Sequence, residues 1–368
     1  MEPFLSKVEK KYLIKTFNEN FISVYGNITR KVKNKITKIT KCPNVTLTNS
    51  GSSALILGLK SLNLKDDDLV ITTNYTFIAT INSIIHTKLK PWIFDIEDKN
   101  FSIDINNLEK IINNDTYKKN GFIYHKKTNQ RITAIMPVIF CGIIPNLKRI
   151  KLISKKYNLK IIMDCAGSFI QLTKNNDLIK ISDIVITSFN GNKSITSGGG
   201  GAIFSNKKKY FKNFDKLSDN SKIGKYIHSD FGFNFKMTNL HASILMGQLD
   251  RISEIIKKKK FINKFYKKNL NSKKFELIKS KDIMWLNLIK LKNYKDKNKL
   301  INNLKKHNIF LERFWVTMNN QKKLKKKMLF TACPVSNLVS EKVLVIPSSI
   351  FLKTKELKKI TDLLNKFN

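Results

Sequence analysis

The sequence predicts an α/β protein in which a large domain, built on a mostly parallel sheet covered by helices, precedes a smaller C-terminal α+β domain. Its 368 residues exceed one typical domain of ~100–200 residues. Short apolar runs alternate with helix-like stretches through the first two thirds of the chain, as expected for strands joined by crossover helices. This pattern changes near residue 250, so we expect a large domain over residues 1–250 and a small domain over residues 251–368.

The strands of the large domain are predicted from short apolar runs, many of them β-branched, which are typical of strands buried on both faces. The runs cover residues 69–73, 91–96, 132–140, 159–164, 183–188 and 201–205. Helices are expected at residues 53–62, 77–86, 105–112, 147–157 and 207–217. Ligands of such sheets bind at the carboxyl ends of strands, where Asp164 and Ser188 fall.

The C-terminal third begins with a long helix, expected from the N-cap residue Thr238 through Asp250 to about residue 258. The elements expected after it are strands at 275–278, 285–291, 309–315 and 343–346, and helices at 296–307 and 354–367. This mixture of strands and helices predicts the small α+β domain.

The chain is strongly basic, with 69 Lys and Arg against 27 acidic residues and a formal net charge of +42. A basic nucleic-acid-binding protein is therefore the alternative from another functional class. The lysines are scattered, however, and the dense runs at 257–260 and 325–327 are short. We therefore interpret them mainly as solvated surface positions, whose field would steer an anionic substrate.

The sequence indicates a cytoplasmic protein. Its longest apolar run, near residues 134–145, is broken by Pro137 and falls short of the ~20 residues of a membrane helix. The first residues do not have the pattern of a secretory signal. The cysteines lie far apart, so we expect reduced thiols and neither disulfides nor a metal site; they are Cys42, Cys141, Cys165 and Cys333.

The segment from Thr187 to Gly201 carries the most informative pattern. A strand ends in Ser188, a short polar loop presents Lys193, and four glycines follow. Such a loop can bury the amine, which lowers its pKa and frees it for Schiff-base chemistry. The alternative is that Lys193 is one of many surface lysines.

Three weaker patterns precede this loop. Asp164 ends an apolar strand and would be a buried carboxylate in need of a cationic partner, although it could simply cap the next helix. Ser50, Gly51 and Ser52 open a helix whose N–H groups could bind a phosphate, although an ordinary cap has the same pattern. Phe77 follows a strand and could stack on a planar ring, although such a residue is often core.

Taken in this order, the patterns resemble the DegT/DnrJ/EryC1/StrS family of sugar aminotransferases, which are fold-type I pyridoxal phosphate enzymes. The resemblance extends from about residue 17 to 347. The string Ser-Phe-Asn-Gly-Asn-Lys at 188–193 is similar to the subgroup that aminates UDP-4-keto-6-deoxy-N-acetylhexosamines, and the segments at 131–138, 228–240 and 313–315 also match.

The resemblance implies roles for individual residues. Lys193 would bind pyridoxal 5′-phosphate covalently and shuttle protons, Asp164 would pair with the pyridinium nitrogen, and Phe77 would stack on the ring. The remaining cofactor-binding residues would be Ser50, Gly51, Ser52, Ser188, Asn192 and, from the neighbouring subunit of a homodimer, Asn234. Lys236, where the family usually has arginine, would lie beside Asn234, and with His228 and Arg313 it is a candidate substrate contact.

The implied reaction moves an amino group from L-glutamate to carbon 4 of a nucleotide-linked 4-keto-6-deoxy sugar, for surface polysaccharide or glycan synthesis. An enzyme of the GDP-perosamine synthase type is the alternative, and a decayed cofactor-binding regulator is another. Related dehydratases have histidine at the lysine position, so Lys193 disfavours them. Two departures bear on activity: Gly167 stands where the family usually has Gln, Glu or His, and Ile139 stands where it has His.

Overall fold

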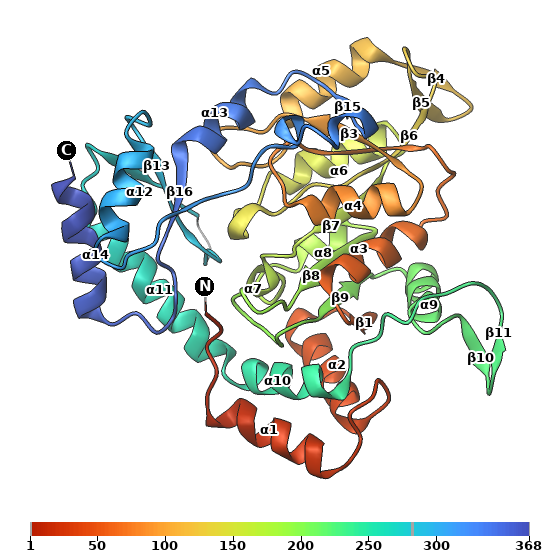
Figure 1. The fold of residues 1–368 in the computed structure, drawn as a ribbon. Helices are drawn as coiled ribbons and strands as arrows, with labels where there is room; N and C mark the ends of the chain where they lie inside the picture. Colours follow the sequence, from red (N-terminus) through yellow and green to blue (C-terminus); the bar gives the residue numbers. More distant parts are fainter. Residues whose placement is uncertain (1, 281–282, 368) are drawn as a thin grey trace.

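The computed structural model describes residues 2–280 and 283–367 (Figure 1). Its large sheet runs in the order β1-β9-β8-β7-β6-β2-β3-β15. The strands are β1 (Val45–Thr48), β9 (Gly201–Phe204), β8 (Ile184–Ser188), β7 (Lys160–Asp164), β6 (Arg131–Ile135), β2 (Leu69–Thr73), β3 (Lys90–Phe94) and β15 (Leu329–Phe330). Along this order all pairs from β8 to β15 are parallel, whereas β9 is antiparallel to both β8 and β1. An antiparallel hairpin, β4–β5, joins the same sheet through pairing of β5 with β6. The predicted mostly parallel sheet is confirmed.

Helices cover both faces of this sheet (Figure 1). On one face, one apolar cluster includes side chains of α2 (Asn27–Thr40), α5 (Ile105–Asp115), α6 (Leu147–Lys156) and α10 (Asn239–Asp250). On the other, a second cluster is built with α3 (Gly51–Lys60), α4 (Ile78–His86) and α9 (Lys208–Leu217). This burial on both faces explains why the strands read as continuous apolar runs.

Some expected elements are wrong in extent. The run at 132–140 forms a strand only as far as Ile135, because Pro137 has no N–H with which to continue the ladder. The run at 309–315 pairs with its neighbour only at β14 (Glu312–Arg313). The long helix begins after Thr238 as expected, but it divides into α10 and α11 (Ile252–Asn269) at Arg251, whose φ of −101° and ψ of 11° are not helical.

A smaller antiparallel sheet lies in the C-terminal part of the chain, in the order β12-β13-β16-β14. Its other strands are β12 (Phe275–Leu277), β13 (Asn287–Leu291) and β16 (Val343–Ile346), and it packs against α11, α12 (Lys297–Lys305) and α14 (Thr354–Lys366). The chain between β14 and β16 leaves this sheet, because β15 pairs with β3 of the large one. The exact domain boundary at residue 250 stays a prediction.

Several elements had no sequence prediction. The N-terminal segment forms α1 (Lys7–Asn18) as well as α2, and both contact α10. The further elements are β4 (Thr116–Lys119), β5 (Phe122–His125), α7 (Phe169–Leu172), α8 (Asp177–Ile181), β10 (Lys222–Gly224), β11 (Ile227–His228), β15, α13 (Pro334–Lys342) and three short 3₁₀ turns. None of the helices in the described part of the chain is long and apolar enough to cross a membrane.

Candidate active site

A cavity of about 320 Å³ opens where β7 and β8 end and α3 and α4 begin. Eight of the residues expected to bind the cofactor line it together: Ser50, Gly51, Ser52, Phe77, Asp164, Ser188, Asn192 and Lys193. These residues come from three strand-to-helix connections of the large sheet and from the loop between β8 and β9. The parallel topology brings them together, because it places the carboxyl ends of neighbouring strands at one edge.

Lys193 lies in the loop after β8, where its backbone N–H donates a hydrogen bond to the backbone carbonyl of Asn190 at 2.9 Å. Burial lowers the pKa of its amine to about 8, although the nearby carboxylate of Asp164 acts in the opposite direction. The amine lies 3.7 Å from the centroid of the Trp285 ring. A lysine in this state has a much larger neutral fraction near neutral pH than an ordinary lysine, and nucleophilic attack on an aldehyde requires the neutral form.

Asp164 ends β7 and is buried at 3% exposure. Oδ2 accepts a hydrogen bond from the Thr80 hydroxyl at 2.8 Å, and Oδ1 accepts one from the N–H of Ala166 at 3.0 Å. Burial raises the pKa of this carboxyl, and the two hydrogen bonds counteract that rise. No ion pair reaches Asp164 from any residue in 2–280 or 283–367. A buried carboxylate that faces a cavity in this way fits a protonated ring nitrogen.

The N-terminus of α3 forms the other end of the cavity. Ser50 is its N-cap and accepts a hydrogen bond from the N–H of Ser53 at 3.0 Å. A Cβ on Gly51 would lie 2.7 Å from the Cβ of Ser188, so only glycine lets the helix start this close to the end of β8. The N–H groups at the helix start, together with the hydroxyls of Ser52 and Ser188, fit the phosphate of pyridoxal phosphate.

Phe77 is the N-cap residue of α4 and is 55% exposed, with its ring centroid 6.3 Å from that of Trp315. It is therefore not a core residue, and its side chain is available to a ring in the cavity. Asn192 also lines the cavity. Its backbone carbonyl accepts a hydrogen bond from Nε1 of Trp285 at 2.8 Å.

Four predicted site residues lie outside this cavity. Asn234 and Lys236 follow the β10–β11 hairpin, and Lys236 pairs with Asp219 at 3.2 Å. His228 is exposed on β11, where its Nδ1 lies 2.7 Å from the carbonyl oxygen of Asn220. Arg313 hydrogen-bonds Asn298 at 2.5 Å. The roles proposed for these four residues stay predictions.

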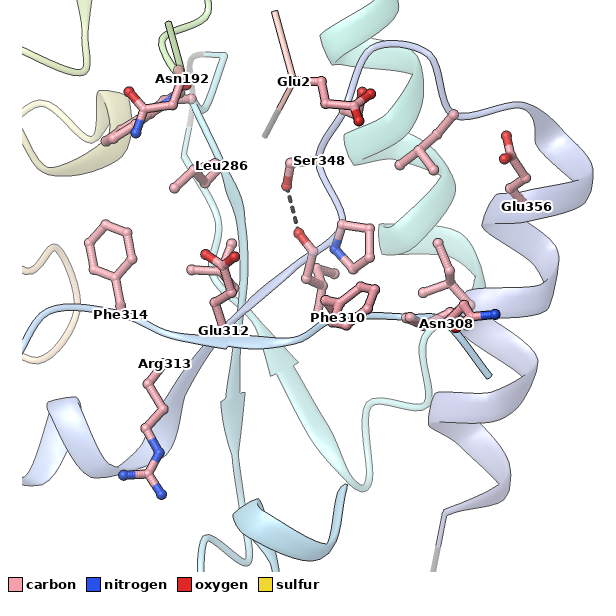
Figure 2. Close-up of a pocket in the computed structure, with 18 of the residues that line it drawn as sticks. Glu2, Asn192, Leu286, Asn308, Phe310, Glu312, Arg313, Phe314, Ser348 and Glu356 are labelled. Atoms are coloured by element: carbon pink, nitrogen blue, oxygen red, sulfur yellow. Dashed lines mark hydrogen bonds between the residues drawn. The ribbon is translucent and has the colours of Figure 1, made fainter. Parts of the chain in front are cut away.

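Arg313 belongs instead to a second cavity, of about 590 Å³, between the 307–315 segment, the end of β16 and α14. Figure 2 shows that Arg313 points to the opposite side of its strand from Glu312 and Phe314, as expected for neighbours in a β-strand. This cavity adjoins the first one, because both are lined by Asn192, Trp285 and Trp315.

Several residues at the site had no sequence prediction. Thr80, Trp285 and Trp315 contact predicted site residues. None of the three had a predicted role, although Trp315 belongs to the 313–315 segment that resembles the family. The interpretation of the 257–260 run as solvated is wrong for one of its lysines. Lys259 is 2% exposed and donates hydrogen bonds to the carbonyls of Trp285 and Ser348 at 2.8 and 3.1 Å.

The fold and the site together define a pyridoxal phosphate-dependent aminotransferase of fold type I. Comparison with known proteins agrees: the model of the DegT/DnrJ/EryC1/StrS aminotransferase family matches residues 3–365. The chain belongs to this family.

Individual relatives are sugar-modifying enzymes. The chain is 30% identical over 311 residues to GDP-perosamine synthase of Escherichia coli O157:H7, covering 82% of this chain and 80% of the relative. It is 27% identical to dTDP-4-amino-4,6-dideoxy-D-glucose transaminase of Shigella dysenteriae, covering 86% of this chain and 82% of the relative. The protein is therefore a pyridoxal phosphate-dependent sugar aminotransferase.

Solved structures show the same fold. PseC of Helicobacter pylori, an aminotransferase of pseudaminic acid biosynthesis, superposes with a TM-score of 0.87 at 18% identity, over 99% of this chain and 96% of that one. NtdA of Bacillus subtilis, solved with bound pyridoxamine phosphate, has a TM-score of 0.85 at 23% identity, over 98% of this chain and 82% of that one.

Proposed function

We propose that the protein transfers an amino group from L-glutamate to carbon 4 of a nucleotide-linked 4-keto-6-deoxy sugar. The observation that supports this most directly is the arrangement of Lys193 and Asp164 in one cavity beside the N-terminus of α3. It combines an amine of lowered pKa, a buried carboxylate and an anion-binding helix start, which are the groups that amino transfer with this cofactor requires.

The residues divide the work by position. Ser52, Ser188 and the N–H groups at the start of α3 would hold the phosphate, and Asp164 would hold a proton on the ring nitrogen. When bound, pyridoxal phosphate supplies the electron sink that allows a C–H bond next to nitrogen to break. The Nζ of Lys193 would remove that proton and return it, and the exposed ring of Phe77 would cover one face of the site.

For the nucleotide of the substrate there are two candidates, which differ in their support. The string at 188–193 favours a UDP-linked N-acetylhexosamine. Three relatives at 26–30% identity are named GDP-perosamine synthases, which favours a GDP-linked sugar. The larger cavity beside Trp285 and Trp315 offers room for the part of the substrate beyond the keto sugar.

We also propose that the protein works as a homodimer with shared active sites, in the cytoplasm. The β10–β11 region exposes a group of apolar side chains, with Tyr226 at 86% and Phe231 at 95% exposure. A patch of this kind is typical of a protein interface, and it adjoins Asn234 and Lys236, the residues expected to reach the neighbouring site. The free, buried cysteines support a reducing compartment.

The reaction is tested by adding pyridoxal phosphate to the purified protein and recording its absorption spectrum before and after L-glutamate. A cofactor band that changes with glutamate, together with 2-oxoglutarate release, supports the proposed donor. Mass spectrometry of products from GDP-, UDP- and dTDP-linked 4-keto-6-deoxy sugars then identifies the acceptor. The control is Lys193→Ala, which should give no turnover with any of them. Turnover by that variant, or amination of no sugar in the panel, contradicts the proposal.

The dimer is tested separately by light scattering after size-exclusion chromatography. We expect the wild-type protein at twice its chain mass of 42.6 kDa. Replacing Tyr226 and Phe231 together by serine should shift it towards the monomer without changing its secondary structure by circular dichroism, because both side chains are exposed within one chain. A wild-type monomer, or a dimer unaffected by both changes, would contradict this part of the proposal.

A further inference from the structure

Gly167 and Trp285 are in close contact although they belong to different parts of the molecule. A Cβ on residue 167 would lie 2.6 Å from Cε3 and 3.1 Å from Cζ3 of the indole. Real Cβ atoms do not approach other atoms this closely, so the indole occupies the space that any side chain at position 167 would need. Residue 167 lines the cavity, and Trp285 therefore forms the wall of the cavity at this point.

The indole is held by hydrogen bonds from both its ring and its backbone. Nε1 donates to the carbonyl of Asn192 at 2.8 Å, in the same loop as Lys193. The backbone N–H of Trp285 donates to the carbonyl of Cys141 at 2.9 Å. Its own carbonyl accepts a hydrogen bond of 2.8 Å from the buried amine of Lys259. These bonds fix the ring in one orientation relative to the large sheet.

The face of the ring is directed at the amine of Lys193, whose Nζ lies 3.7 Å from the ring centroid. Tryptophan binds cations on its face better than other aromatic residues do, and the attraction is stronger where water is excluded. The carboxylate of Asp164 also attracts the charge of Lys193. The amine is therefore in direct contact with an aromatic face, and the carboxylate adds a longer-range attraction without forming an ion pair.

We propose that Trp285 is a positioning residue for Lys193: it fills the space beside Gly167 and, through the face of its indole, holds the lysine amine where it meets the cofactor. This inference rests on the proposed role of Lys193 in binding pyridoxal phosphate. Trp285 itself comes from the segment before β13, so the C-terminal part of the chain helps to place a group of the large sheet.

The test compares Trp285→Leu, which keeps an apolar side chain without a ring, with Trp285→Phe, which keeps the ring face but not the Nε1 donor. The first measurement is the rate at which pyridoxal phosphate becomes attached to Lys193. Borohydride reduction makes the attachment permanent, and mass spectrometry then identifies the labelled lysine. In attachment, the amine condenses with the cofactor aldehyde and water leaves. The second measurement is the affinity for pyridoxamine phosphate, which has no aldehyde and forms no bond to the lysine.

We expect Trp285→Leu to slow attachment about tenfold, because without the ring the amine of Lys193 is no longer held in position to attack the cofactor aldehyde. Its affinity for pyridoxamine phosphate should stay within about threefold of wild type, and Trp285→Phe should attach the cofactor at close to the wild-type rate. Unchanged attachment in the leucine variant overturns the proposal. Equal losses of attachment and pyridoxamine phosphate affinity also overturn it, because Trp285 would then only shape the cavity.

The wild-type protein separates this inference from the proposed function. If its cofactor becomes attached to a lysine other than Lys193, or to none, the role of Lys193 fails first and the inference fails with it. If Lys193 is labelled in the wild type and equally fast in Trp285→Leu, only the role of Trp285 fails.

A second arm tests the contact with Gly167. Gly167→Ala should displace the indole and slow attachment like Trp285→Leu does, and it should lower the melting temperature. In the Trp285→Leu background, the added methyl group has space and should cause no further slowing. Equal effects of Gly167→Ala with and without the indole would show that the two residues act independently, against the proposal.

Discussion

The hydroxyl of Thr80 donates a hydrogen bond of 2.8 Å to Oδ2 of Asp164, joining the first turn of α4 to the end of β7. The same hydroxyl lies 2.8 Å from that of Thr76. Thr80 thus supports the charged form of a carboxylate that burial disfavours. The connection between β2 and α4 therefore contributes the exposed aromatic residue Phe77. The first turn of α4, directly after it, contributes Thr80, the hydrogen-bond donor to Asp164.

Replacing Thr80 by valine should weaken cofactor binding about tenfold, because a hydrogen bond to a buried charged group is lost. The pKa of Asp164 should rise further, since the group that stabilises its ionised form is missing. Calorimetric titration with pyridoxamine phosphate measures the effect. Thr80→Ser keeps the hydroxyl and is the matched control. Equal affinities of the valine and serine variants would argue against this role.

The lowered pKa of Lys193 predicts how cofactor attachment depends on pH. Only the neutral amine attacks an aldehyde, so the attachment rate should rise through a midpoint of about 8 and level off above it. An ordinary lysine, with a pKa of 10.5, would show its rise far higher. Stopped-flow absorbance on cofactor-free protein gives the profile. A midpoint near that of an exposed lysine would show that the amine is not buried in solution.

Gly51 predicts a steric test of the phosphate site. Gly51→Ala should lower the affinity for pyridoxamine phosphate at least about tenfold, because its Cβ would collide with Ser188 and one of the two must move. Gly191→Ala is the control from the same site, since its Cβ would meet only the carbonyl oxygen of Gly198 at 3.6 Å. If both alanine variants bind equally well, the helix start is not closely packed against the end of β8.

Lys259 predicts how stability changes with pH. Burial lowers its pKa from 10.5 to about 7, so above pH 7 the unfolded chain binds this proton and the folded protein does not. The free energy of unfolding should therefore rise with pH above 7, by about 1.4 kcal/mol per pH unit from this group.

Lys259→Met removes the titrating group from both states and should flatten this rise. Urea denaturation of cofactor-free wild type and variant between pH 6.5 and 8.5 measures the difference. This range lies below the ordinary cysteine pKa of 9.0, so thiol ionisation in the unfolded chain adds little to the slope. Parallel stability curves for the two proteins would mean that Lys259 keeps an ordinary pKa in the folded state.

Much of the site was predictable because its residues carry local signals. Asp164 and Ser188 end apolar strands, Ser50 and Gly51 have the composition of a helix start, and Lys193 stands before a run of glycines. Each signal depends on a few neighbouring residues, and the parallel sheet then places strand ends together. The errors fell where the local pattern does not determine the structure. One example is Arg251, where the predicted continuous helix divides and the side chain pairs with Glu9 at 2.9 Å. Nothing in the sequence near residue 251 predicts that partner.

The sequence by itself determined the fold class, the family resemblance and the order of the residues around the cavity, since strand periodicity, caps and loop composition are local properties. Only the tertiary structure decided that Trp285 lies on Gly167 and faces Lys193, and that Lys259 is buried beneath it. These contacts join residues far apart in the chain. They arise because the segment before β13 packs against the carboxyl edge of the large sheet, and side-chain volume and hydrogen bonding there select one arrangement.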